Sequence, residues 1–257
     1  MKARFLALAA LVLGMVSCQQ EFDGAAQVGG EVDFQLQVAA PELSTRADGD
    51  ERNGHDSAYG AIDYLTDWSE VDLRYTLEVY DADADFTDPE LAPVKDRMVK
   101  IVDTYEPVAF DLRLVPNREY RFVVFADFVD ADGNGKHHVI GETLQNITIK
   151  EDGINDECTD AYFDFEDITI TNSAAQPMIL KRPYGKVRVI ATDLAELNLN
   201  VNPGEVVVEY EAAHVAGFNA VTGEIDATTV WTSTTYGYTY AETVSKETLA
   251  AHYYTEG

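Results

Sequence analysis

The stretch VDLRYTLEV, residues 71–79, alternates apolar and polar side chains from end to end. A period of two sends successive side chains to opposite faces, so over this length it predicts a β-strand with one buried face. The stretches VDFQLQV (32–38) and VAFDLRL (108–114) show the same alternation. The stretch YRFVVFADF (120–128) is apolar at most positions, which predicts a strand buried on both faces.

A turn separates the last two of these strands. Residues 115–119, VPNRE, contain Pro116 and Asn117, and both residue types favour turns. The sequence therefore predicts a hairpin in which residues 108–114 and 120–128 pair with each other.

Strand signals continue along the rest of the chain, while helical periodicity is scarce. Residues 229–240 are rich in Thr, Tyr and Trp, which favour strands. Residues 93–102 and 245–252 are short helix candidates. Many strands, few helices and frequent turn residues predict an all-β fold of two antiparallel β-sandwich domains with few short helices.

Two breaks in the pattern predict the domain boundaries. Residues 41–60, PELSTRADGDERNGHDSAYG, have no periodicity and many small or charged side chains, which is typical of an exposed linker that a protease can enter. Residues 172–183 form the second break. We therefore expect an N-terminal β-sandwich domain at 61–180 and a C-terminal one at 181–257 that is short or incomplete.

The first residues are typical of an export signal. Lys2 and Arg4 precede an apolar run at residues 5–16, which is shorter than the roughly 20 residues that span a bilayer but suits a signal peptide. The run ends at Ser17-Cys18, which resembles a bacterial lipobox, whose cysteine becomes the lipidated first residue. We interpret 1–17 as a lipoprotein signal peptide. Residues 18–60 then form a lipidated segment with the first strand and the linker. The alternative is an ordinary signal peptide with an incidental Cys18.

Composition excludes several classes of function. The chain has 46 acidic and 18 basic residues and a net charge of −28, which argues against binding to nucleic acid or to anionic lipid. Once Cys18 is lipidated, Cys158 is the one remaining cysteine, so no internal disulfide or cysteine-based metal site is expected. The sequence has no HExxH, GxSxG or glycine-rich phosphate loop. We expect no enzymatic activity and no cofactor.

Four short motifs together resemble the fimbrillin-type surface lipoproteins of Bacteroidales, which are the subunits and relatives of type V pili. They are the lipobox at Cys18, the linker sequence STRA (44–47), the stretch LRLVPNREYRFVVFADF (112–128) and RPYGKVRVIATD (182–193). The resemblance covers most of the mature chain. It implies fimbrillin-like, transthyretin-like sandwich domains and a lipid anchor in the outer membrane at the cell surface.

The resemblance also implies a mode of assembly. An Arg-directed protease would cut between Arg46 and Ala47 and release the strand at 32–38. A strand from a neighbouring subunit would fill the groove that is left, and head-to-tail repetition gives a filament. The chain ends at Gly257 without an obvious long final strand, which departs from a two-domain pilin.

The expected function is therefore a structural or adhesive component of a pilus, or fimbrium, whose partners are other pilus subunits or host or bacterial surface ligands. The alternative is a monomeric, membrane-anchored lipoprotein that binds a glycan or a protein. Trp68, Trp231 and the 14 tyrosines could line a sugar-binding face, although aromatic residues in a sandwich also serve the core.

Two weaker patterns complete the set of candidate sites. Asp130, Asp132, Asn134 and Gly135 match the first half of a calcium loop, so the candidate metal ion is Ca²⁺. The alternative is a hairpin turn, because Asp, Asn and Gly favour turns for backbone reasons. The sequence DSA around Ser57 resembles the O-glycosylation signal of exported Bacteroidales proteins.

Overall fold

The structure is a computed structural model that describes residues 30–41, 69–151, 156–171, 175–190, 205–239 and 250–255. Its strands are β1 (Val32–Val38), β2 (Asp72–Asp81), β3 (Met98–Val102), β4 (Val108–Leu114), β5 (Glu119–Val129), β6 (His138–Ile140), β7 (Ile147–Ile149), β8 (Ala161–Thr169), β9 (Ala175–Met178), β10 (Gly185–Ile190), β11 (Glu205–Glu209), β12 (Val215–Asn219), β13 (Glu224–Val230), β14 (Thr235–Thr239) and β15 (Ala250–Thr255). Within these ranges the one helical element is a 3-10 turn at Glu157–Thr159. The predicted all-β class with few short helices is confirmed.

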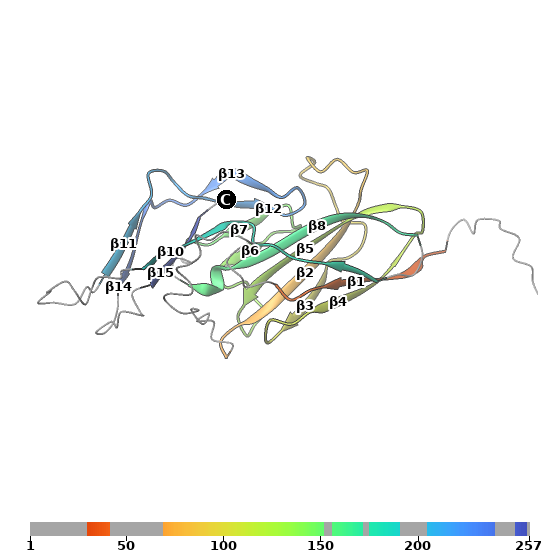
Figure 1. The fold of residues 1–257 in the computed structure, drawn as a ribbon. Helices are drawn as coiled ribbons and strands as arrows, with labels where there is room; N and C mark the ends of the chain where they lie inside the picture. The colour runs from red at the N-terminus through yellow and green to blue at the C-terminus, as the bar shows by residue number, and fades with distance from the viewer. Residues whose placement is uncertain are drawn as a thin grey trace, which may run out of the picture. The chain divides into compact units, whose positions relative to one another are not determined.

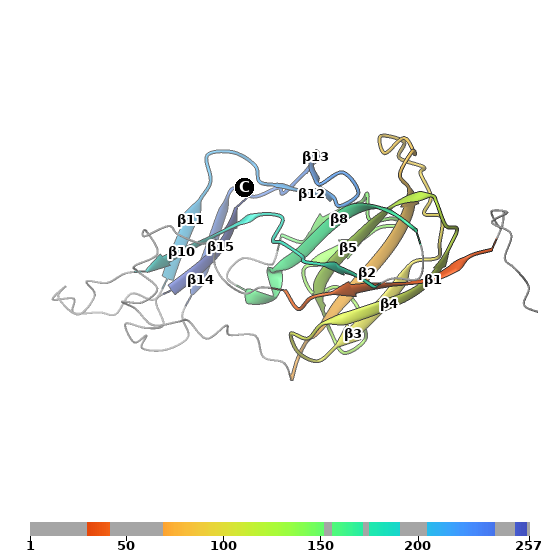
Figure 2. The same ribbon diagram turned by 45° about the vertical axis from the view of Figure 1, so that its right-hand side comes forward.

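Two sheets form the sandwich that contains the first strand (Figures 1 and 2). One sheet has the order β4-β1-β9, and the other has the order β3-β2-β5-β8. All pairs are antiparallel except β1 with β9, which is parallel. The predicted strands at 32–38, 71–79, 108–114 and 120–128 are all present.

One continuous apolar core fills the space between these two sheets. It draws alternate side chains from both sheets, because every second residue of a strand faces the same side. Its largest fully buried members are Leu36, Leu73, Tyr75, Leu77, Phe110, Leu114, Phe122, Phe128 and Tyr162. The Phe34 ring of the first sheet lies 5.1 Å from the Phe122 ring of the second, centroid to centroid.

A third sheet covers the other face of β2 and β5. It has the order β13-β12-β7-β6, and a second apolar cluster including Val123, Phe125 and Phe218 lies beneath it. The prediction that residues 120–128 are buried on both faces is confirmed. The prediction of a single buried face for residues 71–79 is wrong, because the third sheet also buries the polar residues Thr76 and Glu78 of β2.

The predicted hairpin between residues 108–114 and 120–128 is also wrong, although both strands exist. Strand β4 pairs with β1, whereas β5 pairs with β2 and β8 in the opposite sheet. The turn between them crosses from one sheet to the other, with Asn117 at φ = 59°, a conformation that asparagine tolerates. Both strands have an apolar face directed into the same core, so the alternation pattern fits an arch as well as a hairpin.

The helix candidate at residues 93–102 contains a strand instead. Residues Met98–Val102 form β3, an edge strand paired with β2. Of the other helix candidate, residues 250–252 belong to β15, and the remainder lies outside the described residues. Tertiary pairing overrides a weak local preference in both places.

The last third of the chain contributes two further antiparallel pairs, β10 with β15 and β11 with β14. Strands β12 and β7 also pair, over Gly217–Thr148 and Phe218–Ile147. The domain boundaries expected at residues 60 and 181 stay predictions.

We expect Leu36→Ala to lower the free energy of unfolding by about 2–5 kcal/mol, because it leaves a cavity in a fully buried position. The matched control is Gln37→Ala, at the next and exposed position of the same strand, which should change the value by less than about 0.5 kcal/mol. Urea denaturation measures both. Equal effects for the two variants would contradict the observed seating of β1.

Candidate functional site: the seat of the first strand

Strand β1 lies between two strands that come from distant parts of the chain. It pairs with β4 along its whole length, from Val32 opposite Leu114 to Val38 opposite Val108. On its other side it pairs with β9 only from Gln35 onward. The backbone of Ala39 extends this side by donating to the Met178 carbonyl at 3.0 Å. We call the space that β1 fills between β4 and β9 the seat.

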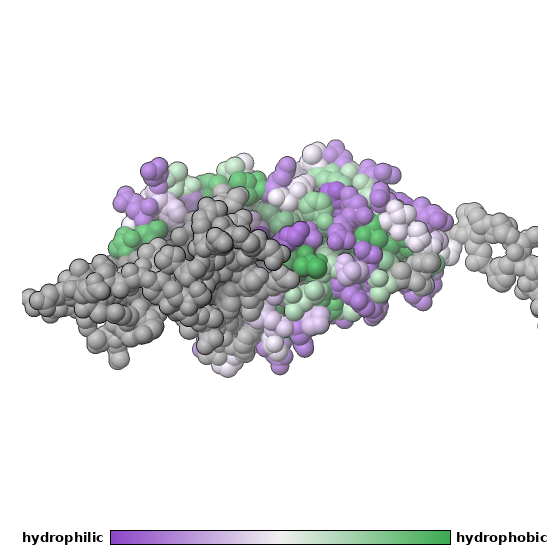
Figure 3. All heavy atoms as spheres, viewed as in Figure 1, coloured by the Kyte–Doolittle hydropathy of each residue, from purple (hydrophilic) through white to green (hydrophobic). Residues whose placement is uncertain are grey.

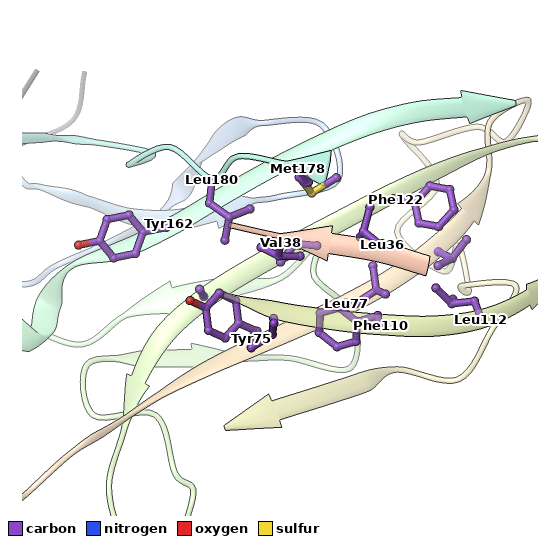
Figure 4. Close-up of a cluster of buried hydrophobic side chains, with 14 of the residues drawn as sticks. Leu36, Val38, Tyr75, Leu77, Phe110, Leu112, Phe122, Tyr162, Met178 and Leu180 are labelled. Carbon is purple, nitrogen blue, oxygen red and sulfur yellow. The ribbon is translucent and has the colours of Figure 1, made fainter. Parts of the chain in front are cut away.

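The side chains on the inner face of β1 are almost fully removed from solvent. Phe34, Leu36 and Val38 are 5%, 0% and 0% exposed. In Figure 4, Leu36 and Val38 lie among buried residues from other parts of the chain. These residues are Tyr75, Leu77, Phe110, Phe122 and Met178 of other strands, and Leu180, which follows β9. At about 1.5–3 kcal/mol for each buried apolar side chain, the three together contribute on the order of 5–9 kcal/mol.

The outer face of β1 is polar and makes weaker contacts. Gln35 Nε2 donates to Asp111 Oδ1 at 2.8 Å, and Gln37 Nε2 donates to Gln35 Oε1 at 2.9 Å. The ion pair between Asp33 and Arg113, at 3.7 Å, is exposed. Exposed pairs of this kind contribute little to stability, so the inner face holds β1 in place.

The order of the chain places β1 before every other described strand. The segment between residues 39 and 71 is its only covalent link to β2 and everything that follows. Among the described strands, β4 and β9 pair with β1 and with no other strand. Removal of β1 would therefore leave two unpaired sheet edges and an apolar groove between them.

An open hollow of about 500 Å³ adjoins β1 near its start. Its lining includes Asp33, Gln35, Asp111 and Arg113, which are polar side chains on the outer face of the sheet, and Ala175 at the start of β9. The hollow lies beside the first residues of β1, before the strand begins to pair with β9 at Gln35. On the face shown in Figure 3, groups of apolar residues are interspersed among hydrophilic ones.

Comparison with known proteins places the chain in a family. The family of unknown function DUF6562 matches residues 25–255. The chain belongs to this family. No curated protein sequence matches it.

Two solved structures are similar to this DUF6562 chain. One is a proposed polysaccharide-binding protein (DUF1812) from Bacteroides thetaiotaomicron, with 12% identity, a TM-score of 0.45, and coverage of 87% of this chain and 71% of that one. The other is the fimbrial anchor protein Mfa2 from Porphyromonas gingivalis, with 14% identity, a TM-score of 0.41, and coverage of 87% and 73%. At these identities the likeness concerns the fold alone.

Several predicted site residues of the DUF6562 chain lie outside the described residues. They are the lipidation site Cys18, the processing site Arg46–Ala47 and the glycosylation candidate Ser57. The signal peptide at 1–17 and Trp68 also lie outside them. These assignments stay predictions. In the part of the chain that the structure describes, no helix is long and apolar enough to span a membrane.

Trp231 is described, and it is 8% exposed. Its Nε1 donates to the Ile149 carbonyl at 2.9 Å, and its ring packs edge-on against His214 and Tyr236. Trp231 therefore serves the packing of this part of the DUF6562 fold.

The predicted calcium residues form a hydrogen-bonded turn. Asp130 Oδ1 accepts from the backbone N–H groups of Asp132 and Asn134, at 3.0 and 2.9 Å. The seventh position of a calcium loop ligates through its backbone carbonyl. Here that carbonyl belongs to Lys136, and it accepts from Lys150 Nζ at 3.0 Å. A calcium ion would have to displace this ammonium group, and calcium binding stays a prediction.

A buried ion pair beside this turn was not predicted from the sequence. Asp127 on β5 is fully buried, and both of its oxygens accept from Arg74 on β2, at 2.9 and 2.7 Å. Arg74 also donates to the Gly133 carbonyl at 3.2 Å, which ties the turn to the sheet. The sequence contained a signal for this ion pair, because an acid within a strand that is expected to be buried on both faces needs a charged partner.

Glu78 and Asp160 are two further acids that are almost fully buried. Glu78 on β2 accepts from Arg97 Nε at 2.8 Å and from the Leu144 N–H at 2.8 Å. Asp160 accepts from Arg182 Nε at 2.5 Å. Among the described residues, no group of three or more His, Cys, Asp or Glu is arranged to hold a metal ion.

The pKa of Asp127 gives a pH prediction. Burial raises this pKa from about 3.8 to about 6, against the opposing effect of the Arg74 guanidinium. Between these values the folded state binds more protons than the unfolded state, so the stabilisation from this group falls as pH rises. We expect the free energy of unfolding, relative to that of Asp127→Asn, to fall by about 2 kcal/mol from pH 4 to pH 6 and to level off above about pH 7. Urea denaturation at each pH measures it, and a rise over this window would show that Arg74 outweighs burial.

Proposed function

We propose that this DUF6562 protein is a structural or adhesive component of the cell surface that assembles by exchange of β1. The observation that carries the proposal is the position of β1. It fills an apolar seat between β4 and β9, and one chain segment connects it to all later strands.

The driving force for exchange is the cost of an empty seat. Without β1, the core residues that surround Leu36 and Val38 meet water, and the edges of β4 and β9 lose their hydrogen-bonding partner. An extended strand with the same alternation restores both interactions, which is β-augmentation. When each copy supplies a strand to the next, the contact is head-to-tail and does not close, so a filament grows.

A cut at Arg46–Ala47 fits this scheme by its place in the chain. It falls between the end of β1 at Val38 and the start of β2 at Asp72. After the cut, β1 is held only by non-covalent contacts, so its replacement depends on the incoming strand. The lipid on Cys18 would anchor the uncut precursor to the outer membrane, and the role needs neither catalysis nor a cofactor.

The test is treatment of the soluble chain, residues 19–257, with an Arg-specific protease. We expect a new N-terminus at Ala47 and a ladder of multimers on a denaturing gel without heating. The double variant Arg46→Ala, Arg52→Ala should remove both results, because a protease of this specificity can otherwise cut after Arg52 in the same linker. The matched control Arg52→Ala alone should keep them. Protein that remains monomeric after complete cleavage at Arg46 would contradict assembly by strand exchange.

The hollow beside β1 supports a second candidate function, the binding of a glycan by an anchored monomer. Its lining combines apolar surface with carboxylate, amide and guanidinium groups in an open depression. Such groups hydrogen-bond sugar hydroxyls, and sites for small ligands are concave. Occupation of the hollow requires β1 to stay in place, so the two functions make opposite demands on this strand.

We expect a protein that acts in this way to bind selected polysaccharides on a glycan array without protease treatment. Gln35→Ala removes an amide from the lining of the hollow and should abolish the binding. The control Glu224→Ala alters an exposed residue of β13 outside the lining and should preserve it. An array that stays blank, or binding that survives Gln35→Ala, would exclude this function for the hollow.

A further inference from the structure

The seat of β1 sets a definite requirement for any strand that replaces it. The strand needs apolar side chains at the four positions of Val32, Phe34, Leu36 and Val38, of which the last two are fully buried. The positions of Gln35 and Gln37 face outward and need polar side chains. The position of Ala39 needs a free N–H for the Met178 carbonyl.

The chain contains a second segment that meets this requirement. Residues 195–201 read AELNLNV, against VDFQLQV at 32–38. Both have apolar residues at the first, third, fifth and seventh positions, an acid at the second, and side-chain amides at the fourth and sixth. Residues 195–201 lie outside the described residues, so the match is one of sequence with a seat that the structure describes.

We propose that residues 195–201 of a second copy of this chain are the strand that enters the seat once β1 has left. This inference rests on the proposed strand exchange and names the donor. Leu199 and Val201 are identical to Leu36 and Val38, the two residues with 0% exposure, so they fit the deepest part of the groove without a change in volume.

The remaining positions are compatible with the same register. Leu197 replaces Phe34 and is smaller, so it keeps an apolar contact with Phe122 at some loss of packing. Asn202 falls at the position of Ala39 and retains the N–H that the Met178 carbonyl accepts. Pro203, which has no N–H, comes one residue later.

The match is selective among the candidates in the chain. The same alternation of apolar and polar residues occurs in β2 and β4, but both of those strands are built into the sandwich core. In the undescribed stretches of the sequence, no other window of seven residues has apolar residues at its first, third, fifth and seventh positions together with polar residues at its fourth and sixth.

The connections within one chain favour a donor from a second copy. In the seat, residues 195–201 would run parallel to β9, as β1 does. Within one chain, two parallel neighbouring strands must be joined by a crossover connection of about a dozen residues or more. Here β10, which is paired with β15, occupies much of the chain between β9 and the segment, and only residues 191–194 follow it.

Disulfide trapping tests the donor and its register. Gln35 lies opposite Asp111, so residue 198 of the donor should lie opposite Asp111 as well. Two chains are prepared with Cys18→Ser, one with Asn198→Cys and the other with Asp111→Cys. Directly opposed strand residues are close enough for a disulfide. After mixing and Arg-specific cleavage, we expect a disulfide-linked dimer, which should be absent without cleavage.

Controls separate the possible outcomes. Asn198→Cys mixed with Glu224→Cys, which is on the exposed surface of β13, should give no dimer. A synthetic peptide of residues 195–201 should shorten the multimer ladder of the unsubstituted protein, and the same peptide with Leu199→Asp should not. The peptide arm does not depend on the folding of any variant.

Multimers that form without the Asn198–Asp111 cross-link and resist the peptide would overturn this donor and leave strand exchange intact. A cross-link within a single chain that carries both substitutions, with no dimer, would overturn the role of the second copy. Absence of multimers from the unsubstituted protein after cleavage would remove the proposed strand exchange, and the donor with it.

Discussion

The burial of one face of β1 is the interaction on which this architecture depends. Strands β4 and β9 have no described partner other than β1, so the three-stranded sheet exists only while that strand is present. Its inner side chains also close the core over Phe122 and Leu77 of the opposite sheet. A short segment at the beginning of the described chain thus determines whether the sheet β4-β1-β9 covers its face of the central sheet.

The central sheet imposes a second constraint, because apolar layers cover both of its faces. A sheet buried on two sides leaves no solvated face for polar side chains, so each acid there needs a partner of opposite charge. Asp127 with Arg74 and Glu78 with Arg97 meet this need and fasten nearby loops to the sheet. These pairs lie on the face of β2 and β5 that is turned away from β1.

The sequence was informative about strands and much less so about their partners. Periodicity located β1, β2, β4 and β5 because alternation is a local property of a half-buried strand. It could not show that β4 and β5 belong to opposite sheets, because an arch and a hairpin demand the same inward-facing residues. It also gave no sign that β9 would pair with β1 in parallel across most of the first half of the chain.

The sequence by itself determined the all-β class, the position of the first strand and its apolar face. These follow from hydrophobic alternation and from the long polar stretch after residue 41. Only the tertiary structure decided that β4 and β9 flank this strand, that its inner side chains are fully buried, and that a third layer encloses Asp127 and Glu78. Burial and strand pairing join residues that are far apart in the chain. A local pattern therefore does not show which distant segment pairs with a strand or buries its side chains.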